Sequence, residues 1–74
     1  MTENEILAGL ILTVKAEREG GYEGWARPPE HMQPQCDLLV ERGLAEKKEF
    51  DRELFYRPTA EGERVCNLTI NRVQ

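Results

Sequence analysis

The chain has 74 residues, of which 39% are hydrophobic and 32% are charged, and its formal net charge is −4 at pH 7. This length suits one small domain, 1–74, whose core is near the lower limit for stable folding, so self-association would add buried surface. No run of about 18 apolar residues occurs, which excludes a membrane-spanning segment. Acidic residues precede the longest apolar stretch, which is not typical of a secretory signal, so we expect a cytoplasmic protein.

The first predicted element is a helix that runs to Glu19. Thr2 and Glu5 have the spacing of a capping box at its start, and Gly20-Gly21 ends it. Helical periodicity places one apolar group on a common face: Ile6, Leu7, Leu10, Ile11 and Val14.

A second row on this helix contains Ala8, Leu12 and Ala16. Two interpretations stay open for it. Leu12 is either a tolerated exposed leucine or part of a small-residue face that contacts a second copy or another protein.

Residues 22–29 form either a short irregular helix or an extended segment, which Pro28-Pro29 then breaks. Its two aromatic residues, Tyr22 and Trp25, either plug the edge of the core near the following hairpin or stand exposed as anchors for a partner.

The next helix begins at Pro29 or Glu30, or else at Pro34, because a proline inside a helix would cost about 3 kcal/mol. It ends at Arg42, before Gly43, which takes a left-handed cap without steric penalty. The expected inward face consists of Met32, Cys36, Leu39 and Val40. The expected outward face consists of Glu30, Pro34, Asp37 and Glu41.

Two short strands follow, Leu44 to Phe50 and Leu54 to Arg57, around a three-residue loop, 51–53. Pro58 ends the second strand because it cannot donate to a ladder. Four basic residues in this hairpin are balanced by four acidic ones, so we expect cross-strand ion pairs.

Thr59 is a good cap for a last helix from Ala60 to about Val73. The apolar residues of this helix fall into two groups, Val65 with Leu68, and Cys66 with Ile70 and Val73. One group must dock onto the domain, which leaves the other for the first helix or a second chain.

The segments "LVERGLAE" and "YRPTAEGERV", joined by a charged hairpin, resemble the second half of a winged helix-turn-helix domain. Bacterial and archaeal transcriptional regulators of that class carry a similar helix end, a two-stranded wing and a similar entry into the next helix. The resemblance covers residues 38–65. It implies an α+β fold with three or four helices and a hairpin wing, and a homodimer through the first and last helices.

The same resemblance implies a DNA-binding regulator of transcription, in which the helix before the wing reads bases in the major groove. The residues that would contact double-stranded DNA are Arg27, His31, Gln33, Gln35, Lys47, Lys48 and Arg52. The acidic balance opposes this function, because carboxylates repel phosphate.

The alternative is an acidic protein-interaction module, an adaptor or inhibitor that has lost DNA binding. Its partner-binding residues would be Glu30, Asp37, Glu41, Leu12, Ile70 and Val73.

Catalytic chemistry is not indicated. The chain has no serine, and its one imidazole, His31, has no triad arrangement with Cys36. Two cysteines thirty residues apart with a single histidine do not make a zinc site, and no glycine-rich phosphate loop occurs. We therefore expect a non-enzymatic protein without metal or cofactor. Cys36 and Cys66 are expected to be reduced, although a disulfide between them stays open.

Overall fold

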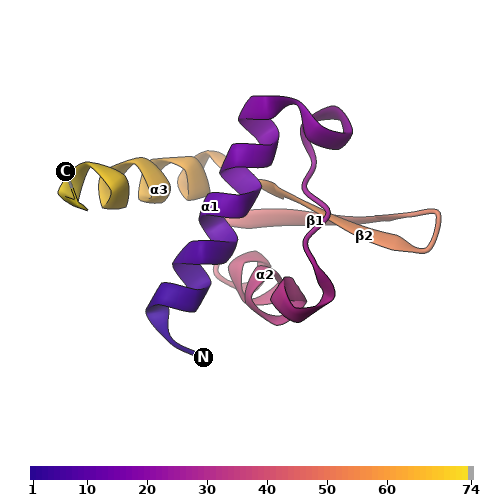
Figure 1. The fold of residues 1–74 in the computed structure, drawn as a ribbon, viewed down its shortest axis with the longest axis horizontal. Helices are drawn as coiled ribbons and strands as arrows, with labels where there is room; N and C mark the ends of the chain where they lie inside the picture. Colours follow the sequence, from indigo (N-terminus) through magenta and orange to yellow (C-terminus); the bar gives the residue numbers. More distant parts are fainter. Residues whose placement is uncertain (74) are drawn as a thin grey trace.

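A computed structural model describes the backbone of residues 1–73 and the side chains of residues 1–69. Within this range the chain is a small α+β domain of three α-helices and a two-stranded antiparallel hairpin. Helix α1 (Glu3–Glu19) crosses the middle of the molecule and α2 (Gln33–Glu41) lies against it. The hairpin and α3 (Ala60–Val73) extend in opposite directions (Figure 1). The described helices include none that is both long and apolar enough to cross a membrane. Ile70 and Val73 were predicted to bind a partner, and their side chains lie outside the described residues.

Helix α1 (Glu3–Glu19) has the predicted bounds. The Thr2 hydroxyl accepts a hydrogen bond from the Glu5 N–H at 3.2 Å, as the capping box predicted. Gly20 ends the helix with φ of 76°, a left-handed conformation that glycine adopts without a Cβ clash.

The buried face of α1 differs from the predicted one. It consists of Ile6, Gly9, Leu10, Thr13 and Val14. Ile11, expected in the core, is 39% exposed. The reason is the close packing of Gly9 against Gln35 and Leu39, where an added Cβ would come within 3.1 Å of the Gln35 side chain. The small residue lets α1 and α2 approach closely, and this turns Ile11 outward.

Residues 22–29 contain no second α-helix. The four residues Gly21–Gly24 form a 3-10 turn, η1, in which Tyr22 and Glu23 have positive φ angles of 43° and 61°. The chain then runs past strand β2 (Glu53–Pro58), where Ala26 pairs with Tyr56 through two backbone hydrogen bonds of 2.6 and 2.9 Å. This segment is therefore fastened to the hairpin by its backbone.

Helix α2 (Gln33–Glu41) follows a second 3-10 turn, η2 (Glu30–Met32). Pro34 lies in its first turn, which confirms the shorter of the two predicted helices, because a proline there removes no helical hydrogen bond. Cys36 and Leu39 are buried as predicted, whereas Met32 and Val40 are only half-buried. Gly43 follows with φ of 75°.

Strands β1 (Ala45–Phe50) and β2 (Glu53–Pro58) pair from Ala45 opposite Pro58 to Phe50 opposite Glu53. The loop has two residues, Asp51 and Arg52, and the predicted three-residue loop was wrong by one. Both have positive φ, 52° and 66°, as a tight turn matched to the strand twist requires.

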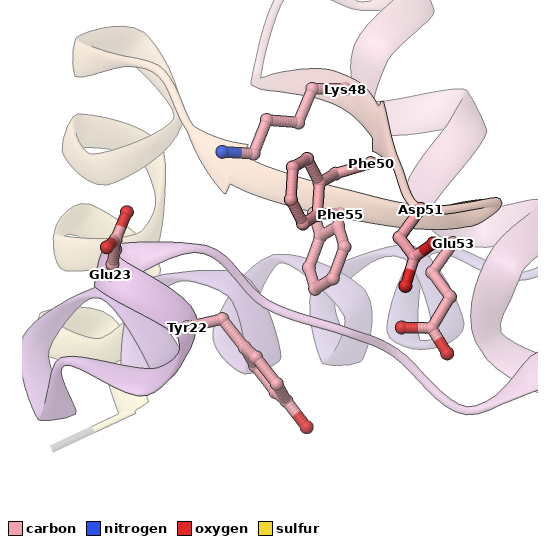
Figure 2. A pocket seen from close by; sticks show the side chains of 7 residues that line it. All are labelled: Tyr22, Glu23, Lys48, Phe50, Asp51, Glu53 and Phe55. Atoms are coloured by element: carbon pink, nitrogen blue, oxygen red, sulfur yellow. The ribbon is translucent and has the colours of Figure 1, made fainter.

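The two faces of the hairpin have different neighbours. Lys47 and Tyr56, opposite each other in register, face α2, whereas Lys48 and Phe55 lie on the other face. That second face is covered in part by η1, whose Tyr22 ring lies 5.5 Å from the Phe55 ring (Figure 2).

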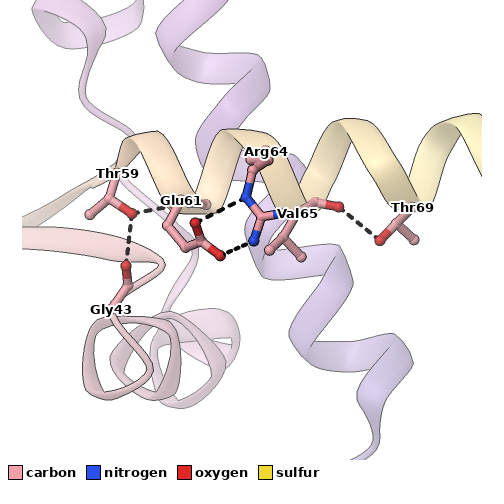
Figure 3. A network of polar contacts seen from close by, with 7 residues as sticks. Gly43, Thr59, Glu61, Arg64, Val65 and Thr69 are labelled. Carbon is pink, nitrogen blue, oxygen red and sulfur yellow. Dashed lines mark hydrogen bonds and ion pairs between the residues drawn. The ribbon is translucent and has the colours of Figure 1, made fainter.

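Helix α3 (Ala60–Val73) begins beside the end of α2. The Thr59 hydroxyl donates to the Gly43 carbonyl at 2.8 Å and accepts from the Gly62 N–H at 3.1 Å (Figure 3). The Thr59 N–H donates to the Leu44 carbonyl at 3.1 Å. The predicted cap is therefore confirmed, and it also binds α3 to the base of the hairpin.

The core lies where α1, α2, β1 and α3 meet. Its buried members are Ile6, Leu10, Val14, Leu39, Ala45 and Cys66. Val65 packs against this cluster, while Leu68 is 51% exposed. Cys36 and Cys66 are both buried and are free thiols.

The first prediction concerns Gly62. A Cβ at this position would overlap the Leu44 carbonyl oxygen, which is backbone and cannot rotate away. We expect Gly62→Ala to lower the free energy of unfolding by about 2 kcal/mol, roughly 10 °C in Tm. Thermal unfolding followed by circular dichroism measures this. Gly21→Ala is the control, because a Cβ there meets nothing closer than 3.8 Å, and an equal loss in both variants would contradict the argument.

The second prediction concerns the hairpin turn. Arg52 has φ of 66°, which costs a non-glycine residue conformational energy, so Arg52→Gly should raise the free energy of unfolding by about 0.5 kcal/mol. Denaturant unfolding measures the change. Arg42→Gly, at a position with φ of −85°, should give no gain, and a stabilisation of similar size there would disprove the conformational explanation.

Candidate functional site

The space between η1 and the hairpin contains an aromatic and cationic cluster. The Lys48 ammonium lies 4.4 Å from the centre of the Trp25 ring, and the Arg57 guanidinium lies 4.6 Å from it. A cation this close to an aromatic ring is attracted by the ring quadrupole. Trp25 is half-buried by these contacts, in line with the prediction that it plugs the core edge beside the hairpin.

Beyond Trp25 the surface is hollowed over a volume of about 420 Å³. We call this the aromatic hollow, and its lining residues are Tyr22, Glu23, Lys48, Phe50, Asp51, Glu53 and Phe55. Figure 2 shows Glu23 at the η1 end, Asp51 and Glu53 at the hairpin end, and the aromatic rings between them.

Two aromatic rings of the hollow are open to solvent. Tyr22 is 60% exposed and Phe50 is 68% exposed, whereas Phe55 is buried beneath them. Tyr22 therefore follows the second interpretation, an exposed aromatic side chain. Exposed aromatic residues gathered in one depression are typical of binding surfaces.

The charge of the hollow is mainly negative. Three carboxylates line it against one ammonium group, that of Lys48. Glu53 forms an ion pair of 2.6 Å with Arg27. Within residues 1–69, no ion pair holds Glu23 or Asp51.

The backbone of η1 is strained where it presents Tyr22. Tyr22 and Glu23 both lie in the left-handed region, which costs an L-residue about 1–2 kcal/mol. Such strain persists only where the surroundings impose it, and it concentrates at binding and catalytic sites. Here the surroundings are the Tyr22–Phe55 ring contact and the two backbone bonds of Ala26.

On the opposite face of the hairpin, the negative charge of Asp37 on α2 is paired with Lys47. Its carboxylate accepts hydrogen bonds from the Tyr56 hydroxyl at 2.6 Å and from the Lys47 ammonium at 2.8 Å. Burial raises the pKa of Asp37, but the bonds from Lys47 and Tyr56 outweigh it and leave the pKa below its usual value. Burial, with the Asp37 bond, also raises the pKa of Tyr56. The side chain of Asp37 is 48% exposed, so the predicted outward position holds in part, but its carboxylate is bonded to the hairpin and is not free for a ligand.

The residues predicted to contact DNA do not form one basic strip. Lys47 and Lys48 lie on opposite faces of the hairpin, the first paired with Asp37 and the second held over Trp25. Gln35 is only 8% exposed, and its amide donates to the Glu5 carbonyl at 2.6 Å, so it is not available at the surface. This corrects its assignment as a base contact, because the close approach of α1 and α2 encloses it.

Three other predicted DNA contacts do come together. Arg27, Gln33 and Arg52 line a second hollow of about 420 Å³ between the start of α2 and the hairpin turn. We call it the hairpin-tip hollow, and Pro28, Glu30, Glu53 and Leu54 complete it. His31 is exposed on η2. The lining of this hollow therefore contains two guanidinium groups, those of Arg27 and Arg52, and two carboxylates, those of Glu30 and Glu53.

The residues predicted for a protein partner are dispersed. Glu30 and Glu41 are exposed on the α2 side, and Leu12 is half-buried on α1. The residues that form the aromatic hollow were not predicted as a site, apart from Lys48 and the alternative for Tyr22. Phe50, an apolar residue directly before a hairpin turn, was the available signal.

The described side chains offer little reactive chemistry. Burial, and then the charge of Asp37, raise the pKa of the Cys36 thiol to about 11, which disfavours the nucleophilic thiolate. Residues 1–69 contain no group of three histidine, cysteine or carboxylate side chains positioned to hold a metal ion.

Comparison with protein-family models, curated proteins and solved structures gives no match.

The third prediction follows from Asp37. Because its folded pKa is lowered, its bonds stabilise the fold above the unfolded pKa and lose that effect as pH falls through the folded pKa. Asp37→Asn should therefore cost about 1 kcal/mol at pH 7, and the difference from wild type should shrink below about pH 4. Urea unfolding from pH 7 to pH 3 measures it. Glu41→Gln, an exposed carboxylate of the same helix, is the control, and the same shrinking difference there would contradict the assignment.

Proposed function

We propose that this chain is a small, non-enzymatic binding domain with winged-helix-like architecture, whose ligand is another protein. The observation that carries the proposal is the aromatic hollow, in which Tyr22 and Phe50 are exposed above buried Phe55. Large exposed aromatic side chains cost solubility, and their clustering in one depression is explained by a partner that covers them.

The distribution of cations supports a protein ligand over DNA. Binding to a duplex depends on basic side chains that are available to neutralise phosphates. Here Arg27, Lys47 and Arg57 are paired with carboxylates at 2.6 to 2.8 Å. Within residues 1–69, Arg52 is the one basic residue of the hairpin with neither an ion pair nor an aromatic contact.

The proposal places the domain among adaptors or inhibitors and gives it no catalytic role. Winged-helix-like architecture is supported by the order of a helix, a charged hairpin and a further helix over residues 38–65. The helix before the hairpin is preceded by the 3-10 turn η2 in place of a second α-helix, so a complete helix-turn-helix reader is not part of the proposal.

DNA is the second candidate, and one observation favours it. Arg27, Gln33 and Arg52 converge on the hairpin-tip hollow, with exposed His31 on the adjacent turn. Arginine and glutamine are side chains that read guanine and adenine in the major groove. In this function the hollow would lie on the duplex and Arg52 would contact phosphate.

The fourth prediction separates the two candidates. Fluorescence anisotropy of a labelled random-sequence duplex, titrated with protein at about 50 and 200 mM salt, should show no salt-dependent rise at micromolar protein. In parallel, immobilised protein at micromolar concentration should retain a protein partner from an extract of the source cells, and the purified partner should bind directly.

A steep salt-dependent rise in anisotropy, reduced by Arg52→Ala and not by Lys15→Ala, would instead support DNA. Lys15 is the matched control because it is an exposed basic residue on α1, away from both hollows. Absence of any retained protein would count directly against the proposed function.

A further inference from the structure

We infer that the aromatic hollow is a receptor for an arginine side chain on the surface of the partner protein. The inference rests on the proposed function and specifies the chemistry of the partner. It is carried by the combination of exposed aromatic rings with a rim of carboxylates in one depression of about 420 Å³. The two kinds of group attract the same ligand, a cation with a flat or apolar surface.

The aromatic rings favour a cation. The faces of Tyr22 and Phe50 carry the negative lobe of the ring quadrupole, and both are more than half exposed. The same protein already holds Lys48 and Arg57 over Trp25 at 4.4 and 4.6 Å. Within residues 1–69, no cation lies over Tyr22 or Phe50, so these rings remain for a group from outside.

The rim favours the same charge. Glu23 stands at one end of the hollow and Asp51 at the other, with Glu53 beside it (Figure 2). Lys48 is the single opposing charge, and its ammonium is directed to Trp25. A phosphate or another acidic ligand would meet net repulsion here, which argues against nucleotides and nucleic acids as ligands of this hollow.

Arginine fits better than lysine. Its guanidinium is planar, stacks on aromatic rings and can bond to a carboxylate with two N–H groups at once. A carboxylate of this rim already binds a guanidinium, since Glu53 accepts from Arg27 at 2.6 Å. An incoming arginine stacked on Phe50 would meet Asp51, the adjacent residue in the turn.

The test uses ¹⁵N-labelled protein and three capped tripeptides, Gly-Xaa-Gly, in which Xaa is arginine, lysine or citrulline. Citrulline has the shape of arginine without its charge. We expect the arginine peptide to shift the amide resonances of residues 22–23 and 48–55, with a dissociation constant below about 10 mM. The lysine peptide should bind more weakly, and the citrulline peptide should not bind.

Variants locate the site. Phe50→Ser and Asp51→Asn should each weaken binding of the arginine peptide by about fivefold. Lys48→Gln should strengthen it, because a competing positive charge is removed, and a merely structural role of the hollow would not produce this gain. Leu68→Ser, which removes an exposed apolar side chain on α3, is the matched control and should bind as wild type does. Phe50 is 68% exposed, so its substitution should leave the fold intact, as the spectrum itself will show.

No shift at these amides, equal shifts with citrulline or lysine, or unchanged affinity in Phe50→Ser would each overturn the inference. Its failure is distinct from failure of the proposed function. A partner protein retained equally by wild type and Phe50→Ser would leave the function standing and disprove the arginine receptor. An arginine peptide bound at the hollow with no partner protein retained would establish the receptor chemistry and disprove the function.

Discussion

The position of the hairpin depends on Tyr56, which is fully buried and has bonds to two other segments of the chain. Its backbone exchanges two hydrogen bonds with Ala26, and its hydroxyl donates to Asp37 on α2. A buried hydroxyl must find a partner, because leaving it without one costs roughly 1–3 kcal/mol. Asp37 supplies that partner and is itself bonded to Lys47 on the neighbouring strand. The segment after η1, the hairpin and α2 are thereby held at fixed distances from one another.

This arrangement decides which charges remain for a ligand. A chain with 32% charged residues has many groups that could act at a surface. The fold uses several of them internally, since Lys47 binds Asp37, Arg57 binds Glu46, and Arg27 binds Glu53. Exposed pairs of this kind contribute little stability individually. Their larger effect is to occupy basic side chains that could otherwise bind phosphate, and this leaves an acidic surface beside the exposed rings.

The same fixed distances hold η1 against the hairpin. Two neighbouring residues with positive φ, Tyr22 and Glu23, would relax in an isolated peptide. In the folded chain Gly20 and Gly24 turn the backbone on either side, and the Ala26 bridge prevents the segment from moving away. Tyr22 is consequently presented next to Phe55 from a backbone fastened to the hairpin, which reduces the conformational entropy that a partner must remove on binding.

The sequence by itself determined the features that depend on neighbouring residues. The Thr2 and Thr59 caps and the glycine after α2 were predictable, because each depends on groups within about four positions. The start of α2 near Pro34 was one of two starts that the sequence left open. The tertiary structure alone decided the rest. Gly9 allows α1 to pack closely on α2, which buries Gln35 and exposes Ile11, and the hairpin supplies Tyr56 and Lys47 as partners for Asp37. The aromatic hollow likewise joins residues 22–23 to residues 48–55, and the contacts that bring such distant segments together depend on packing and burial that no local pattern encodes.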